Sequence, residues 1–184
     1  MSITTLDPRT ALIVVDLQKG IVNYVPPQPF AQLLKRNQAL LAAFRARALP
    51  VVLVNAAGLA PGRNEQPRLE APPPAGWDEL LPELGQQASD ILVTKHTWGA
   101  FVRTGLEERL KALGVTQVVV TGVATSIGVE STARQAYELG FNVTLAIDAM
   151  ADLSVEAHER SIRLIFPRLG ETGATQDIID RLDA

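Results

Sequence analysis

The strongest constraint on the fold is a series of short apolar runs, rich in β-branched residues, that alternate with helical patterns. The runs are Ala11–Val15, Val51–Asn55, Ile91–Thr94, Val118–Gly122 and Asn142–Ile147. They lack polar alternation, which is typical of strands covered on both faces. Strands that alternate with helices favour a parallel sheet. We therefore predict an α/β fold: a single doubly wound domain over residues 1–184, with a mostly parallel five- or six-stranded sheet and helices on both faces.

Helical patterns occupy much of the sequence between and after these runs. They are Phe30–Ala48, Gly105–Leu113, Glu130–Leu139, Ser154–Phe166 and Thr175–Leu182. Thr104 and Glu107 have the spacing of a capping box, and Ser154 is of the type that caps a helix N-terminus. The stretch Leu169–Ala174 contains two glycines and fits either a short edge strand or a loop.

The composition excludes several classes of protein and site. The 184 residues are 47% hydrophobic and 20% charged, which indicates a compact fold rather than a disordered chain. The chain has no cysteine, so disulfides, zinc–thiolate sites, iron–sulfur clusters and a thiol nucleophile are ruled out.

Charge and hydropathy also limit the partners and the location. The formal net charge is −3 and no basic cluster exceeds two residues, so we expect no nucleic-acid partner. No apolar stretch approaches the roughly 20 residues of a membrane span, and the N-terminus lacks the basic region of a signal peptide. We therefore expect a cytoplasmic protein with no membrane partner.

Polar residues directly follow the predicted strands, where open α/β sheets bind their ligands. They are Asp16, Asn55, Lys95 with His96, the stretch Gly122–Gly128, and Asp148. Asp16 alone would be a typical capping aspartate, and Lys95 alone a typical surface lysine. As a pair at the end of neighbouring apolar runs they would cost several kcal/mol to desolvate, which indicates a site rather than a source of stability.

Two further segments could contribute to such a site. The Gly122–Gly128 turn would let a ligand approach backbone N–H groups at a helix N-terminus, but it is neither a dinucleotide fingerprint nor a P-loop. Its Ser126 has no recognisable base, and His158 is expected to face solvent. The Pro- and Gly-rich segment Ala56–Gly76 is longer than most connections, so it is either a functional loop or a surface excursion.

Three segments of the sequence resemble the isochorismatase-like hydrolases, a superfamily that includes nicotinamidases and N-carbamoylsarcosine amidases. They are Thr10–Gly20 (TALIVVDLQKG), Val93–Phe101 (VTKHTWGAF) and Thr121–Ala149, which is similar to the family's signature G-V-x-T-x-x-C-V-x-x-T-A-x-x-A. The resemblance covers nearly the whole chain. It implies that Asp16 is the catalytic aspartate and Lys95 the catalytic lysine.

The chain departs from this pattern at one position. The amidases of the family carry their nucleophilic cysteine where this sequence has Gly128. The isochorismatases proper also have glycine there, and they hydrolyse a vinyl ether with the aspartate as general acid. The resemblance thus implies that Asp16 protonates a vinyl ether carbon, that Lys95 orients the acid and the substrate, and that Gly128 leaves room for the substrate. It also implies a cis peptide bond between Val123 and Ala124.

The residues nearest to these positions are candidates for substrate binding. They are His96, Trp98, Phe101, Val123 and Ala124. For Phe101, packing in the core is an equal alternative. The proposed acid also poses a physical conflict, because a general acid needs a raised pKa whereas the charge of Lys95 lowers the pKa of Asp16. Burial would have to outweigh the lysine, or the charge of the substrate would have to offset it.

Two hypotheses of different classes follow. The first is a cofactor-free hydrolase of a small-molecule substrate, with Asp16 and Lys95 as working groups and no metal. The nicotinamidase branch uses an Asp/His cluster after the second strand, and Asn55–Pro74 contains neither residue type. The second is a catalytically inactive small-molecule-binding or scaffold protein of the same fold. The resemblance also makes a homo-oligomer plausible.

Overall fold

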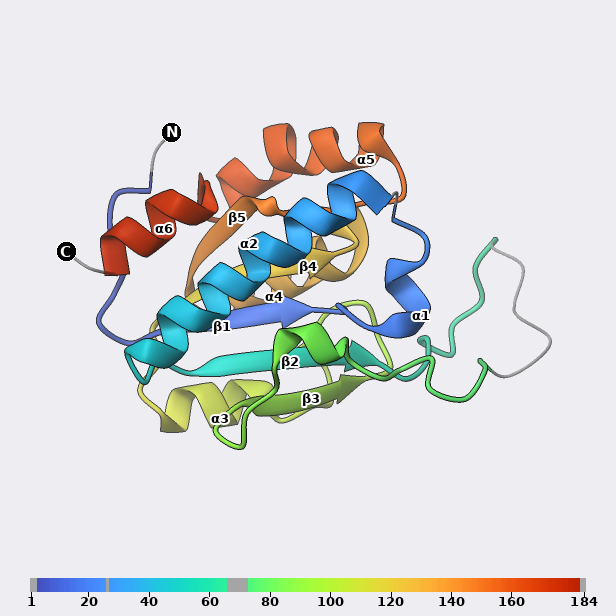
Figure 1. Cartoon of the computed structure of the whole chain (residues 1–184), viewed down its shortest axis with the longest axis horizontal. Helices are drawn as coiled ribbons and strands as arrows, with labels where there is room; N and C mark the ends of the chain where they lie inside the picture. Colours follow the sequence, from blue (N-terminus) through green and yellow to red (C-terminus); the bar gives the residue numbers. More distant parts are fainter. Residues whose placement is uncertain (1–2, 26, 66–72, 183–184) are drawn as a thin grey trace.

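The predicted apolar runs all form strands of one parallel sheet. The computed structural model describes residues 3–25, 27–65 and 73–182 (Figure 1). The strands are β1 (Thr10–Val15), β2 (Val51–Ala56), β3 (Ile91–Lys95), β4 (Gln117–Val123), β5 (Asn142–Ala151) and β6 (Glu171–Gly173). Their order is β3-β2-β1-β4-β5-β6 and every neighbouring pair is parallel. The α/β prediction is confirmed. The stretch Leu169–Ala174, for which the sequence allowed a strand or a loop, contains the edge strand β6.

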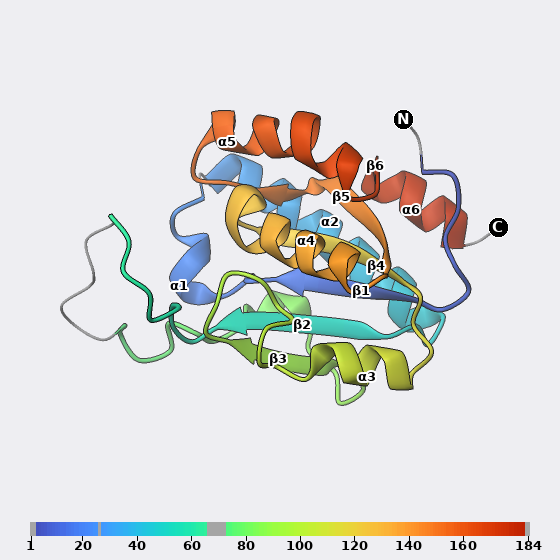
Figure 2. The same ribbon diagram turned by 180° about the vertical axis from the view of Figure 1, so that it is seen from behind.

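Helices lie on both faces of this sheet (Figures 1 and 2). They are α1 (Lys19–Val22), α2 (Pro27–Ala46), α3 (Leu106–Ala112), α4 (Glu130–Glu138), α5 (Val155–Arg160) and α6 (Thr175–Leu182). Shorter helical turns are η1 (Pro82–Leu84), η2 (Thr125–Val129), η3 (Ser161–Ile165) and η4 (Phe166–Arg168), of which η2 and η3 are π-helical. Within the described residues, no helix combines the length and apolar character needed to cross a bilayer.

The two layers of the core follow from the alternation of side chains along β1, the central strand. Ala11, Ile13 and Val15 belong to the hydrophobic cluster that includes residues of α3 and α4. Leu12 and Val14 belong to the second cluster, which includes residues of α2 and α6. Successive side chains of a strand point to opposite faces, so a continuous apolar run is what a strand needs when helices cover both sides. All residues of β1 are buried, as this reasoning predicts.

The prediction that every run is covered on both faces is wrong for β3. Its exposure alternates, with Ile91, Val93 and Lys95 buried and Leu92 and Thr94 exposed. This strand lies at the edge of the sheet, and the buried pair Ile91 and Val93 faces the layer that contains α3. On the other face at this edge, the apolar Leu92 is 47% exposed.

Of the two helix caps that the sequence predicts, one is formed and the other is not. The capping box expected from Thr104 and Glu107 is not formed. Gly105, in a left-handed conformation with φ 69°, directly precedes α3. The hydroxyl of Thr104 accepts the N–H of Leu106 at 3.3 Å, but the carboxylate of Glu107 binds Lys111 one turn later instead of completing a capping box. The cap at Ser154 is confirmed, because its Oγ accepts the N–H of Ala157 at 3.2 Å.

The carboxyl ends of β1 and β4 approach each other more closely than a side chain would allow. Gly122 pairs with Val15 and has φ 113°, a conformation that favours glycine. A Cβ atom at Gly122 would lie 2.0 Å from the carbonyl oxygen of Val15. The bare backbone of Gly122 therefore fixes the position of the residue that follows Val15, which is Asp16.

We expect Gly122→Ala to lower the free energy of unfolding by about 3 kcal/mol or more, because the methyl group would meet backbone atoms and the φ angle would be strained. Gly114→Ala is the matched control, since Gly114 also has a positive φ (70°) but no atom within 4 Å of an added Cβ. It should cost only about 1 kcal/mol. Urea unfolding of both variants measures the difference, and equal losses would contradict the proposed close approach.

Candidate active site

Asp16 is the central residue of the site, directly after β1. Its backbone has φ 52°, an uncommon left-handed conformation for a residue other than glycine, and its N–H donates to the carbonyl oxygen of Val54 at 2.9 Å. The residue is only 4% exposed. Its Oδ2 accepts a hydrogen bond from Lys95, whereas its buried Oδ1 has no partner in the part of the chain that the structure describes. Backbone strain and an unpartnered buried oxygen are both typical of a functional residue.

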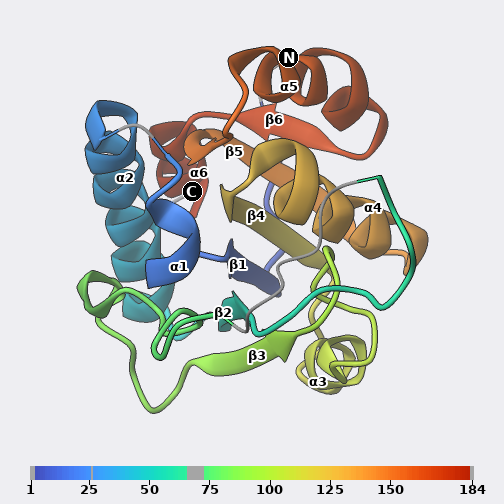
Figure 3. The same cartoon turned by 90° about the vertical axis from the view of Figure 1, so that its right-hand side faces the viewer.

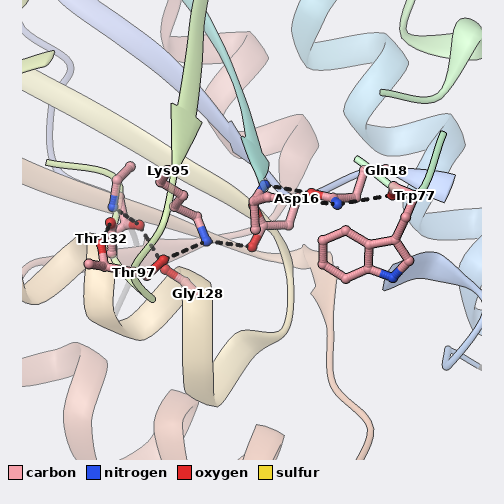
Figure 4. A network of polar contacts seen from close by, with 10 residues as sticks. Asp16, Gln18, Trp77, Lys95, Thr97, Gly128 and Thr132 are labelled. Atoms are coloured by element: carbon pink, nitrogen blue, oxygen red, sulfur yellow. Dashed lines mark hydrogen bonds and ion pairs between the residues drawn. The ribbon is translucent and has the colours of Figure 1, made fainter. Parts of the chain in front are cut away.

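Lys95, the last residue of β3, supplies the opposite charge. Its Nζ donates to Oδ2 of Asp16 at 2.7 Å and to the carbonyl oxygen of Thr97 at 3.1 Å (Figure 4). The lysine is 2% exposed, so the ion pair is almost completely removed from water. Such a pair repays its desolvation poorly as a source of stability. An ammonium group has three N–H donors, and the described residues accept two of them, which leaves one for another acceptor.

The electrostatics of the pair settle the conflict that the sequence posed. The pKa of Asp16 is raised from 3.8 to about 6, and the largest cause is burial, because desolvation penalises the charged carboxylate. The charge of Lys95 and its hydrogen bond lower the same pKa, but by less than burial raises it. The carboxyl group therefore exchanges its proton close to neutral pH.

Gly128 completes the group of three residues that the sequence singled out. It lies in the π-helical turn η2, and a Cβ atom there would lie 3.1 Å from Oδ2 of Asp16 and 3.1 Å from Cγ1 of Val15. Asp16, Lys95 and Gly128 thus meet at the carboxyl edge of the sheet, the side of the molecule that Figure 3 turns toward the viewer. The Val123–Ala124 peptide bond that precedes η2 is cis, at the position that the resemblance implies.

Comparison with known proteins identifies the family. The Isochorismatase domain matches residues 10–177. The chain belongs to the isochorismatase family. It is 38% identical over 181 residues to the uncharacterised isochorismatase family protein YwoC of Bacillus subtilis, covering 95% of this chain and 94% of that protein. It is 41% identical to the uncharacterised family member YecD of Escherichia coli O157:H7, covering 94% of this chain and 96% of that protein.

A solved structure has the same fold. An isochorismatase family protein from Burkholderia thailandensis superposes with a TM-score of 0.92, at 40% sequence identity, and the match covers 100% of both chains. The architecture described above is therefore that of the isochorismatase family over its whole length.

The other predicted substrate-binding residues of this isochorismatase-family protein have different surroundings. Trp98 is 55% exposed on the loop after Lys95, and His96 is exposed and lies against Gly58, where a Cβ atom would come within 2.9 Å of its Nδ1. Phe101 is buried in the core, with its ring centroid 5.9 Å from that of Phe141. Val123 and Ala124 are both buried at the end of β4.

Sequence reasoning missed a buried residue beside Asp16. Gln18 is fully buried, and its Nε2 donates to the carbonyl oxygens of Ala56 at 3.0 Å and Trp77 at 3.1 Å, while its Oε1 accepts the N–H of Ala56 at 2.7 Å. One amide therefore joins the two ends of the long Pro- and Gly-rich segment, of which residues 66–72 lie outside the described part of the chain. An amide two residues after Asp16, just past the end of an apolar run, was the available signal.

Trp77 carries no comparable signal in the sequence. Its indole ring packs on Gly20, where a Cβ atom would lie 2.0 Å from Cδ1 of the ring. Figure 4 shows it on the same side of the ion pair as Gln18, whereas Thr97 and Thr132 lie on the other side.

His158, which we expect to face solvent, is half-buried. Its Nδ1 lies 2.8 Å from Oγ1 of the buried Thr125 in η2, and burial lowers the pKa of the imidazole. In the same turn, the N–H of Ser126 donates to Oδ2 of Asp152 at 2.6 Å. Within the described residues, no three His, Asp or Glu side chains gather as metal ligands would.

The raised pKa of Asp16 predicts a pH dependence of stability. Well below pH 3.8 the folded and unfolded states both hold the proton, whereas at higher pH the unfolded state releases it first. The free energy of unfolding should therefore fall as the pH rises through about 6. A shift of about two pKa units corresponds to about 3 kcal/mol.

Urea unfolding of the parent protein and Asp16→Asn between about pH 4 and about pH 7 measures this contribution. The Asn variant should lose this part of the pH dependence. Asp180→Asn, which removes an exposed carboxylate of α6, is the matched control and should retain it. An identical pH dependence in the parent and Asp16→Asn would show that the pKa of Asp16 is not raised.

Proposed function

We propose that this isochorismatase-family protein is a cofactor-free hydrolase of a small metabolite, with Asp16 as the general acid. The observation that carries the proposal is the buried Asp16 carboxyl group, whose pKa is raised to about 6 and whose Oδ1 has no partner among the described residues. A group that holds a proton near neutral pH and has a free oxygen can deliver that proton to a bound molecule.

The reaction that suits this site is the hydrolysis of a vinyl ether. Asp16 gives its proton to the terminal alkene carbon, and the ether oxygen supplies electrons to form an oxocarbenium ion. Water then attacks the carbon that carries positive charge and loses one proton, which restores Asp16, so that a hemiketal forms. The hemiketal breaks its bond to the ether oxygen, its remaining hydroxyl proton is transferred to that oxygen, and the products are a ketone and an alcohol.

Lys95 and Gly128 have supporting roles in this proposal. The ammonium group of Lys95 fixes the carboxyl group through Oδ2, which leaves Oδ1 toward the substrate. Gly128 keeps the space next to Oδ2 free of a side chain. The chain has no cysteine, so covalent catalysis by a thiol, as in the amidases of the resembled superfamily, is not available.

The competing hypothesis is a small-molecule-binding protein without catalysis. A turnover screen with isochorismate and related vinyl ethers, alongside a panel of amides, separates the two. If neither the parent nor Asp16→Asn converts any of them, and both bind small carboxylates equally well, the protein is a binding protein. Hydrolysis of a vinyl ether by the parent supports the proposal.

The rate of hydrolysis should depend on the protonated form of Asp16. We expect kcat/KM for a vinyl ether to be highest below about pH 6 and to fall about tenfold per pH unit above it, because the acid loses its proton. Asp16→Asn should lower kcat/KM by about 100-fold or more. Steady-state rates across this pH range measure both effects. A rate that does not decrease at higher pH would exclude Asp16 as the acid.

A side chain at position 128 should interfere with the reaction. Gly128→Ala places a methyl group 3.1 Å from Oδ2 of Asp16, so the acid has to move by a few tenths of an ångström. We expect kcat/KM to fall by about tenfold, because catalysis is sensitive to small displacements. Gly114→Ala, remote from the site, is the control and should keep the parent's activity. Unchanged activity in Gly128→Ala would contradict the proposed role of Gly128.

A further inference from the structure

We propose that Thr132 and Gln135 of α4 are positioning residues for the reaction, because together they hold the segment Thr97–Phe101 against Lys95. We call these two side chains the α4 clamp. The inference rests on the proposed function in so far as the clamp serves catalysis. The inference also states that the clamp holds Lys95 at Asp16, which can be tested by measuring a property of Asp16 without a substrate.

The first part of the clamp is Thr132, whose side chain is completely buried. Its Oγ1 donates to the carbonyl oxygen of Gly128 at 2.7 Å and accepts the N–H of Ala100 at 3.1 Å. A single hydroxyl group therefore connects the glycine beside Asp16 with the loop that follows Lys95 (Figure 4). Within the described residues, the hydroxyl thus both donates and accepts a hydrogen bond.

The second part is Gln135, three residues further along the same helix face. Its Oε1 accepts the N–H of Phe101 at 3.0 Å, next to the N–H that Thr132 holds. Gly99 makes room for this amide, because a Cβ atom there would lie 2.3 Å from Oε1. Two consecutive backbone N–H groups are thus held by side chains of one helix, instead of by a regular turn.

The clamp acts on the ion pair through Thr97. The carbonyl oxygen of Thr97 accepts one N–H of Lys95 at 3.1 Å, and the Thr97 hydroxyl donates to the carbonyl oxygen of Gly99 at 3.0 Å. The contacts therefore form a closed path from Gly128 through Thr132 and the segment Thr97–Phe101 to Lys95 and Asp16. The segment also carries Trp98, one of the candidate substrate-binding residues.

The α4 clamp itself is uncharged, so it can influence Asp16 only through geometry. If the segment moves away, Lys95 loses its second acceptor and its ammonium group is no longer fixed at Oδ2 of Asp16. Burial then acts on the carboxyl group with less opposition from the lysine, so the pKa of Asp16 should rise further. A side chain that merely packed in the core would have no such effect.

The test compares Thr132→Val, which keeps the shape but removes the hydroxyl, with Thr132→Ser, which keeps the hydroxyl. The pKa of Asp16 is measured by NMR titration of protein labelled with ¹³C at the Asp carboxyl groups, and its signal is assigned by its loss in Asp16→Asn. We expect Thr132→Val to raise this pKa by about one unit and Thr132→Ser to leave it at the parent's value. Glu138→Gln, on the exposed part of α4, is the control.

Kinetics provide the second measurement. With a vinyl ether as substrate, Thr132→Val should lower kcat by about tenfold through the displaced ion pair, and Thr132→Ser should restore it. If none of the proteins turns over a substrate but the pKa of Asp16 still shifts in Thr132→Val alone, the proposed function fails and the clamp stands.

One result would overturn the inference. A folded Thr132→Val protein with the parent's Asp16 pKa and kcat would show that the clamp does not position the pair. If Thr132→Val does not fold, two other variants replace it. Gln135→Leu removes the amide that holds Phe101, and Gly99→Ala displaces it, so the pKa of Asp16 and kcat are measured in these variants instead. Parent values in those two variants would overturn it equally.

Discussion

The buried ion pair between Asp16 and Lys95 is the interaction on which the rest of the site depends. Its partners are 79 residues apart in sequence and end two strands, β1 and β3, that are separated by β2. Removing two charges from water is costly, so the pair persists only because the fold holds both side chains in place. The same burial that makes the pair expensive moves the pKa of Asp16 toward neutrality. Desolvation therefore both reduces the stability that the pair contributes and raises the pKa of Asp16.

Bare backbone around the carboxyl group is the second requirement of the site. Gly122 lets the ends of β1 and β4 approach, and Gly128 brings the turn η2 against Oδ2 of Asp16. A side chain at either position would meet atoms that the site needs where they are. In the proposed mechanism, a chain without cysteine and without a side chain at residue 128 uses a buried acid rather than a thiol.

Much of the fold could be predicted from local patterns, and the errors have identifiable causes. Continuous apolar runs predicted the strands, because a strand that is buried on both faces needs apolar side chains at consecutive positions. The exposed face of β3 was missed, because the position of a strand within the sheet depends on strand order. The polar contacts of Gln18 and Thr132 were missed as well, because their partners lie in distant segments that only folding brings together.

By itself, the sequence determined the strand and helix types, the family resemblance and the identity of the two charged residues that end apolar runs. These follow from periodicity and from residue type, which are local properties. Only the tertiary structure decided that Asp16 and Lys95 meet at 2.7 Å, that one oxygen of Asp16 is left without a described partner, and that burial outweighs the lysine in setting the pKa of Asp16. Hydrogen bonding and desolvation depend on which groups surround an atom in space, and in this chain those groups come from β1, β3, η2 and α4.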